Sequence, residues 1–158
     1  MTEMNETEAA RGPPVNAGIY LDSSALAKLY LPEDESDRLD DLLRGRRDLM
    51  ISELAITEVL SAVTRRKREG LIDAEQAFQI RDALLADAGS GVFDLLNLDP
   101  AVHREAERLL LGNASLPLRT LDALHVALAL SGSSSHMITF DVRMRAVALQ
   151  VGLRVVDV

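Results

Sequence analysis

The stretch IYLDSSAL, residues 19–26, decides the fold prediction for this 158-residue chain. A short apolar run typical of a buried strand leads directly into an acidic residue, and a helical pattern follows. The same order recurs in MITFDVRM, residues 137–144, where an apolar run ends at Asp141. Apolar strands that end at an acid and continue into a helix indicate an α/β domain with its polar site at the strand ends.

Apolar runs and helical patterns alternate along the rest of the chain. The predicted strands cover residues 19–21, 49–52, 92–98, 136–140 and 153–156. The predicted helices cover residues 24–31, 36–44, 54–69, 73–88, 100–112, 120–130 and 142–150. Gly45 suits a left-handed helix end, and Asp99-Pro100 and Thr120 are helix-start signals. This alternation predicts a parallel sheet with helices on both faces.

Composition narrows the class of protein. The chain is 47% hydrophobic, which fits one domain over residues 19–158, whereas residues 1–18 are polar and predict a flexible leader. It lacks cysteine, which excludes disulfides and thiol catalysis. A net charge of −8 argues against general attraction to nucleic acid or to anionic membranes, without excluding an RNA substrate. We expect a cytoplasmic protein that neither associates with membranes nor binds DNA directly.

Four acidic residues interrupt apolar stretches: Asp22, Glu58, Asp122 and Asp141. A buried carboxylate is unfavourable by several kcal/mol unless its charge is compensated, and these stretches offer no obvious basic partner. A hard divalent cation, Mg²⁺ or Mn²⁺, is the natural shared partner for such oxygens. Because Asp22 and Asp141 each follow a predicted strand, we expect both at one edge of the sheet, with Asp122 beside them and Glu58 reaching inward through its longer side chain.

The segments IYLDSSALAKLYL, ELAITEVLSAVTRR, LRTLDALHVALAL and ITFDVRM, in this order, resemble the PIN-domain ribonucleases, particularly VapC toxins of type II toxin-antitoxin systems. The resemblance implies a Rossmann-like three-layer α/β/α sandwich, with a mainly parallel sheet of four or five strands. It also implies a Mg²⁺- or Mn²⁺-dependent endoribonuclease whose catalytic and metal-binding quartet is Asp22, Glu58, Asp122 and Asp141. A homodimer and a VapB-like antitoxin are the implied partners.

Hydroxyl side chains often accompany the acids in this family, and Ser23, Ser24 and Thr139 match that pattern. The basic run at Arg65, Arg66 and Arg68 follows Glu58 on the same predicted helix, and it is a weaker candidate for contact with RNA phosphate. Its simpler interpretation is a solvated last turn that complements the helix dipole.

Simpler interpretations stand beside several of these assignments. Asp22, Ser24 and Asp141 could cap helices, because such residues commonly do so after a strand. His125 lies three residues after Asp122 on one helical face, and we expect it to pack in the core or to satisfy a hydrogen bond.

Two other functions compete with the nuclease. A phosphoacceptor receiver domain would need a late lysine, whereas only Lys28 and Lys67 occur. A catalytically inactive PIN-fold binding module would use the acids to capture a basic partner segment.

Overall fold

The protein is represented by a computed structural model that describes residues 13–112 and 117–158. One sheet of five parallel strands organises these residues, in the order β3-β2-β1-β4-β5. The strands are β1 (Ile19–Leu21), β2 (Leu49–Ser52), β3 (Asp94–Leu96), β4 (His136–Ile138) and β5 (Arg154–Val155). In the central strand, Ile19 is in register with Leu49 on one side and His136 on the other.

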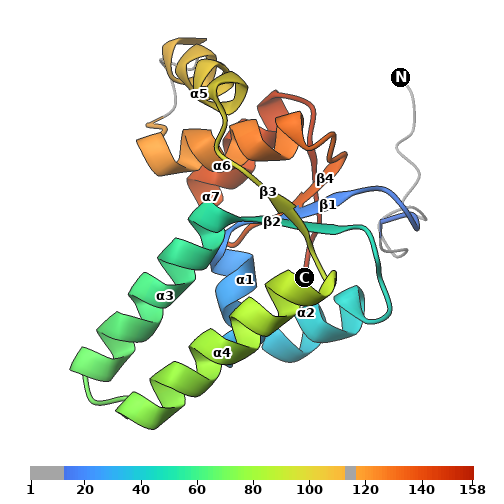
Figure 1. The fold of residues 1–158 in the computed structure, drawn as a ribbon. Helices are drawn as coiled ribbons and strands as arrows, with labels where there is room; N and C mark the ends of the chain where they lie inside the picture. The colour runs from blue at the N-terminus through green and yellow to red at the C-terminus, as the bar shows by residue number, and fades with distance from the viewer. Residues whose placement is uncertain (1–12, 113–116) are drawn as a thin grey trace.

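Helices lie on both faces of this sheet (Figure 1). They are α1 (Ser23–Tyr30), α2 (Ser36–Leu43), α3 (Glu53–Arg68), α4 (Ala74–Ser90), α5 (Pro100–Gly112), α6 (Thr120–Ser131) and α7 (Val142–Gln150). Helices α1 to α4 cover one face, and α5 to α7 cover the other. The predicted three-layer α/β/α sandwich with a parallel sheet is confirmed.

Successive side chains of β1 point alternately into two different hydrophobic cores. Ile19 and Leu21 point into the core shared with α1, α2, α3 and α4, whereas Tyr20 between them points into the core shared with α5, α6 and α7. All three side chains are fully buried. Strand residues alternate between faces, so a strand covered on both sides must be apolar at every position. Because helices cover β1 on both faces, the apolar run before Asp22 is uninterrupted.

Several predicted boundaries are confirmed, and others shift. Gly45 has a φ of 76°, as its place after a helix predicted, and Asp99 accepts a hydrogen bond of 2.9 Å from the amide of Val102 at the start of α5. The edge strand β3 pairs only over Asp94–Leu96 and is shorter than predicted. The strand predicted to reach Phe140 ends at Ile138.

Two helix ends also differ from prediction. Helix α4 runs on through Gly89 to Ser90, and the next residue, Gly91, is its C-cap with a φ of 82°. Thr120 is the first residue of α6 and not its cap, because the cap position belongs to Arg119. The amide of Arg119 donates to the side chain of Asp122, which supplies the capping hydrogen bond instead.

The segment before β1 is held by one arginine. The Arg46 guanidinium donates to the carbonyls of Pro13 and Pro14, both at 2.8 Å, and pairs with Asp48. Residues 1–12 of the predicted leader lie outside the described residues, so that prediction stays open there.

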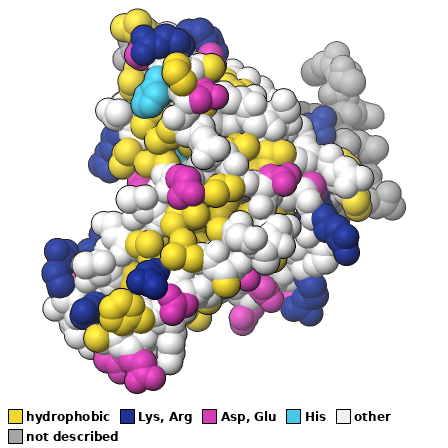
Figure 2. Space-filling view, viewed as in Figure 1, with side chains coloured by type: hydrophobic (Ala, Val, Ile, Leu, Met, Phe, Trp, Pro, Cys, Tyr) yellow, Lys and Arg dark blue, Asp and Glu magenta, His cyan; other side chains and the backbone are white. Residues whose placement is uncertain are grey.

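Figure 2 shows hydrophobic side chains across the middle of one face of the molecule, with Lys and Arg mostly toward its margins. Within residues 13–112 and 117–158, none of the helices combines the length and apolar character needed to span a membrane.

Candidate active site at the carboxyl edge of the sheet

The centre of the sheet is a topological switch point. Strands β1 and β4 are neighbours, but the helix after β1 packs on one face and the helix after β4 packs on the other. Connections that diverge in this way leave a crevice beyond the strand ends. Asp22 follows β1 directly and its amide donates to Ile138, the last residue of β4. Asp141 lies three residues after Ile138, in the connection between β4 and α7.

A cavity of about 450 Å³ opens at this point. Its lining includes all four predicted acids, Asp22, Glu58, Asp122 and Asp141. They come from four places in the chain: the caps of α1 and α7, the second turn of α3 and the first turn of α6. The structure therefore brings together residues that lie 36, 64 and 19 positions apart in the sequence.

Asp22 is the most enclosed of the four, with no exposed surface. One carboxylate oxygen accepts hydrogen bonds from the amide of Ala25 at 2.9 Å and the hydroxyl of Ser24 at 2.7 Å. The other accepts from the hydroxyl of Thr139 at 2.7 Å. Burial raises the pKa of Asp22, and these hydrogen bonds together with nearby His125 oppose the rise without cancelling it.

Asp141 caps α7, and its Oδ1 accepts from the amides of Arg143 at 2.8 Å and Met144 at 3.1 Å. The capping interpretation is thus correct for Asp22 and Asp141, yet both side chains also line the cavity. Thr139 connects the two, because its hydroxyl donates to Asp22 and accepts from the amide of Asp141.

The three predicted hydroxyl residues divide between two acids. Ser24 and Thr139 donate to Asp22, and Ser24 also accepts from the amide of Phe140 at 2.8 Å. Ser23 lines the cavity together with Glu58 and acts to lower the pKa of that acid. Ser24 therefore orients Asp22 and does not cap a helix itself.

Glu58 is anchored by a residue that the sequence interpretation left in the core. Its Oε2 meets His125 Nε2 at 2.5 Å, while His125 Nδ1 lies 2.8 Å from the hydroxyl of Tyr20. Burial acts to raise the pKa of Glu58, but the hydrogen bond from His125, the positive charge of His125 when protonated, and the nearby Ser23 hydroxyl lower it overall. Burial raises the pKa of Tyr20, so its phenol stays protonated.

The donor set of this cavity fits a hard cation chemically. Four carboxylates converge, and the acid with the least access to water, Asp22, forms no ion pair with Lys or Arg in the described part of the chain. Converging carboxylates of this kind need a positive charge or a proton. No group of three Asp, Glu or His side chains among the described residues is already close enough to hold a metal ion. Binding would therefore draw the carboxylates closer together.

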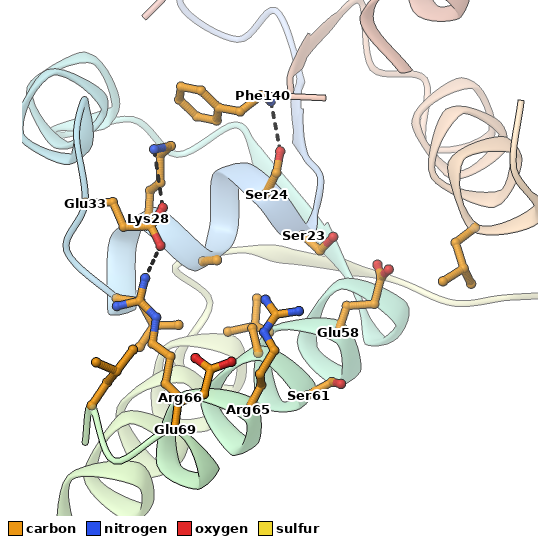
Figure 3. A pocket seen from close by; sticks show the side chains of 16 residues that line it. Ser23, Ser24, Lys28, Glu33, Glu58, Ser61, Arg65, Arg66, Glu69 and Phe140 are labelled. Carbon is orange, nitrogen blue, oxygen red and sulfur yellow. Dashed lines mark hydrogen bonds and ion pairs between the residues drawn. The ribbon is translucent and has the colours of Figure 1, made fainter. Parts of the chain in front are cut away.

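A second, larger hollow of about 860 Å³ continues from the acidic cavity between α1 and α3. The two share Ser23, Ser24, Glu58 and Leu121 as lining residues. In Figure 3, Arg65 and Arg66 rise from α3 into this hollow, and Arg66 forms an ion pair with Glu33.

The three arginines that were phosphate candidates thus differ in their surroundings. Arg65 lines the hollow without an ion-pair partner among residues 13–112 and 117–158, while Arg68 is exposed and lies outside the lining. Arg119 also lines the acidic cavity, a placement that its sequence context did not predict.

Known proteins resemble this chain along most of its length. The family described as "PIN domain" matches residues 19–149. Ribonuclease VapC46 of Mycobacterium tuberculosis is 39% identical over 142 residues, which span 89% of this chain and 97% of that protein. The chain belongs to the VapC group of the PIN-domain family.

Solved structures share the fold of this PIN domain. VapC20 of Mycobacterium tuberculosis, described as a sarcin-ricin loop cleaving toxin, superimposes with a TM-score of 0.66 at 18% identity, over 82% of this chain and 94% of that one. VapBC2 of Rickettsia felis, bound to a DNA fragment from its promoter, gives 0.60 at 15% identity, over 87% and 96%. At these identities the likeness concerns the fold alone.

Proposed function

We propose that this PIN domain is a metal-dependent endoribonuclease toxin that hydrolyses RNA phosphodiester bonds. The observation that carries the proposal is the convergence of Asp22, Glu58, Asp122 and Asp141 on one cavity at the switch point of the sheet. The relative VapC46, 39% identical to this chain, is named a ribonuclease, which supports the same reaction class.

Asp22, Asp122 and Asp141 are the proposed ligands of Mg²⁺ or Mn²⁺, and Glu58 is proposed to act through a water molecule. When bound, such a cation supplies a Lewis acid that makes water a nucleophile near neutral pH and offsets phosphate charge. Ser24 and Thr139 keep the Asp22 carboxylate turned toward the cavity by donating to its two oxygens. Arg119 places a positive charge at the same cavity, where a phosphate could bind.

A VapB-like antitoxin is the proposed partner. One chain in the structure of VapBC2, whose name combines VapB and VapC, shares the fold of this chain. The acidic cavity would also complement a basic side chain of an antitoxin. We also propose a homodimer, because two exposed apolar side chains offer surface to a second chain. Leu71, which precedes α4, is 67% exposed, and Phe78 in α4 is 57% exposed. The net charge of −8 supports the proposal that this chain makes no direct DNA contact.

A cleavage assay on a labelled RNA tests the activity. We expect cleavage with Mg²⁺ or Mn²⁺, none with a chelator, and a loss on the order of 100-fold or more in Asp22→Asn, typical when an electrostatic stabiliser is removed. The matched control is Asp94→Asn, an exposed aspartate at the amino end of β3, which should cleave at the parent rate. Parent-like cleavage by Asp22→Asn would disprove the mechanism. Absence of both cleavage and Mn²⁺ binding in the parent would favour the inactive binding module.

A further inference from the structure

A chain of four polar side chains crosses the interior behind the acidic cavity. Ser52 Oγ lies 2.8 Å from the hydroxyl of Tyr20, which lies 2.8 Å from His125 Nδ1, and His125 Nε2 meets Glu58. Ser52 and Tyr20 have no exposed surface, and His125 is 1% exposed. Only Glu58, whose side chain is 26% exposed, reaches solvent. The chain therefore connects the buried core to one acid of the cavity.

The direction of these hydrogen bonds follows from counting donors. Ser52 caps α3 and accepts from the amide of Ala55 at 3.1 Å, and Tyr20 is its other side-chain partner among the described residues. The proton of Ser52 must therefore go to Tyr20, and the proton of Tyr20 must go to His125 Nδ1. A neutral imidazole that accepts at Nδ1 carries its proton at Nε2. That N–H then donates to the carboxylate of Glu58.

Glu58 needs such an anchor more than the other three acids do. Asp22 and Asp141 are fixed by the helix ends that they cap, and Asp122 accepts from the amide of Arg119. Glu58 instead lies within α3 on a longer side chain, and ordering a Glu side chain is entropically unfavourable. Repulsion from the neighbouring carboxylates also favours a rotamer that points to solvent.

Core packing alone does not account for a histidine at this place. Residues 123–129 of α6 are all buried, and apart from His125 every one of them is Ala, Leu or Val. An imidazole among them is unfavourable unless both nitrogens have partners. Here both do, and one of the two partners is an acid that lines the cavity.

We propose that His125 is a positioning residue, which Tyr20 orients through Nδ1 so that its Nε2–H holds the Glu58 carboxylate at the acidic cavity. The inference rests on the proposed function insofar as Glu58 belongs to the metal site. The hydrogen-bond arrangement itself can be tested without a metal.

The first test uses histidine labelled with ¹⁵N in the metal-free protein. The chain has three histidines, so the His125 signals are assigned by their loss in His125→Gln. We expect the proton on Nε2 and a hydrogen-bonded, unprotonated Nδ1. Glu58→Ala should shift the Nε2 signal, and Tyr20→Phe should shift the Nδ1 signal. A proton on Nδ1, or Nε2 signals that Glu58→Ala leaves unchanged, would overturn the proposal.

The second test measures Mn²⁺ affinity by calorimetry. We expect His125→Leu to bind about tenfold more weakly, as is common when a residue that orients a metal ligand is lost. His125→Gln, which retains an N–H donor, should restore most of the affinity. In a Glu58→Ala background, His125→Leu should cause no further loss. An equal loss with and without Glu58 would mean a purely structural role and would overturn the proposal.

These outcomes separate the inference from the proposed function. If the parent binds no Mn²⁺, the metal dependence proposed above fails, while the ¹⁵N result still decides whether His125 holds Glu58. If His125→Leu does not fold, Tyr20→Phe replaces it, because it removes only the hydroxyl that orients the ring. We expect Tyr20→Phe to weaken Mn²⁺ binding in the parent and not in Glu58→Ala, and weakening in both backgrounds would overturn the proposal.

Discussion

The carboxylate of Asp22 accepts three hydrogen bonds, yet among the residues that the structure describes it has no lysine or arginine within ion-pair distance. Burial raises its pKa, which means that the ionised form is disfavoured in the folded protein. Functional sites commonly retain such unfavourable groups at the expense of stability. For Asp22 the hydrogen bonds from Ser24 and Thr139 fix an orientation without removing the penalty of burial.

Replacing that charge should stabilise the fold while abolishing activity. We expect Asp22→Asn to raise the melting temperature by about 2 °C or more at neutral pH without divalent cations, since roughly 1 kcal/mol corresponds to 2–4 °C in a domain of this size. Differential scanning fluorimetry with chelator measures this. Asp94→Asn serves as the control and should leave the melting temperature unchanged. A decrease of several degrees in Asp22→Asn would show that the ionised carboxylate is net stabilising.

Arg65 and Arg68 offer a matched pair on one helix. Arg65 lines the hollow that continues from the acidic cavity, whereas Arg68, three residues further on, lies outside that lining. If RNA runs along this hollow, Arg65→Ala should raise KM and reduce the salt dependence of binding by about one counterion, with little change in kcat. Arg68→Ala should change neither quantity. Equal effects of the two variants would indicate general electrostatic attraction and no local phosphate contact.

At the scale of elements, the ion pair between Arg46 and Asp48 determines how the chain enters β1. Arg46 and Asp48 are 12% and 10% exposed, and Asp48 also accepts from the amide of Gly18 at 3.3 Å. The pair therefore links the segment before β1 to the loop before β2. Burial acts to raise the pKa of Asp48, but the hydrogen bonds and the charge of Arg46 outweigh it and lower the pKa overall.

This lowered pKa makes the contribution of Asp48 depend on pH. A carboxyl whose folded pKa lies below its unfolded value of about 3.9 stabilises the fold above that pH, and the contribution is lost as pH falls through the folded pKa. We expect Asp48→Asn to reduce the free energy of unfolding by about 1.5–3 kcal/mol at pH 7, the range for hydrogen bonds to charged groups. Urea denaturation at pH 7 and at pH 3 measures the difference, which should shrink at the lower pH. A gap that stays constant would contradict this account.

At the scale of the whole molecule, the acidic cavity joins parts of the chain that pack in different layers. Asp22 belongs to the connection into α1 on one face, and Asp122 belongs to α6 on the other. A cation held by both would link the two layers across the end of the sheet. Because the unfolded chain does not bring these acids together, binding energy would add to folding stability.

Divalent cations should therefore raise the melting temperature of the parent protein. At a concentration 100 times the dissociation constant, a ligand that binds only the folded state adds about 2.7 kcal/mol, or roughly 5–10 °C for a domain of this size. Thermal denaturation with Mn²⁺ and with chelator tests this expectation. Asp22→Asn should lose most of the increase. The metal site is refuted if the parent shows no increase, or if the variant shows the same one.

Local sequence predicted the framework of the site well. The apolar run before Asp22 predicted β1, and the Asp99-Pro100 pair predicted the start of α5. It predicted less well where tertiary contacts override local signals. β4 ends before Thr139, whose hydroxyl turns to Asp22, and Thr120 does not cap α6, because Asp122 supplies the capping bond to Arg119.

The sequence by itself determined the order of strands and helices, several helix caps and the family, because apolar runs, capping residues and turn glycines act over a few neighbouring positions. Only the tertiary structure decided that His125 meets Glu58, 67 residues away, and that Arg119 joins the acids. Such contacts depend on how α3 and α6 pack at opposite faces of one sheet edge. Helical periodicity places a side chain on a face of its own helix, but it does not say which residue of another helix faces it.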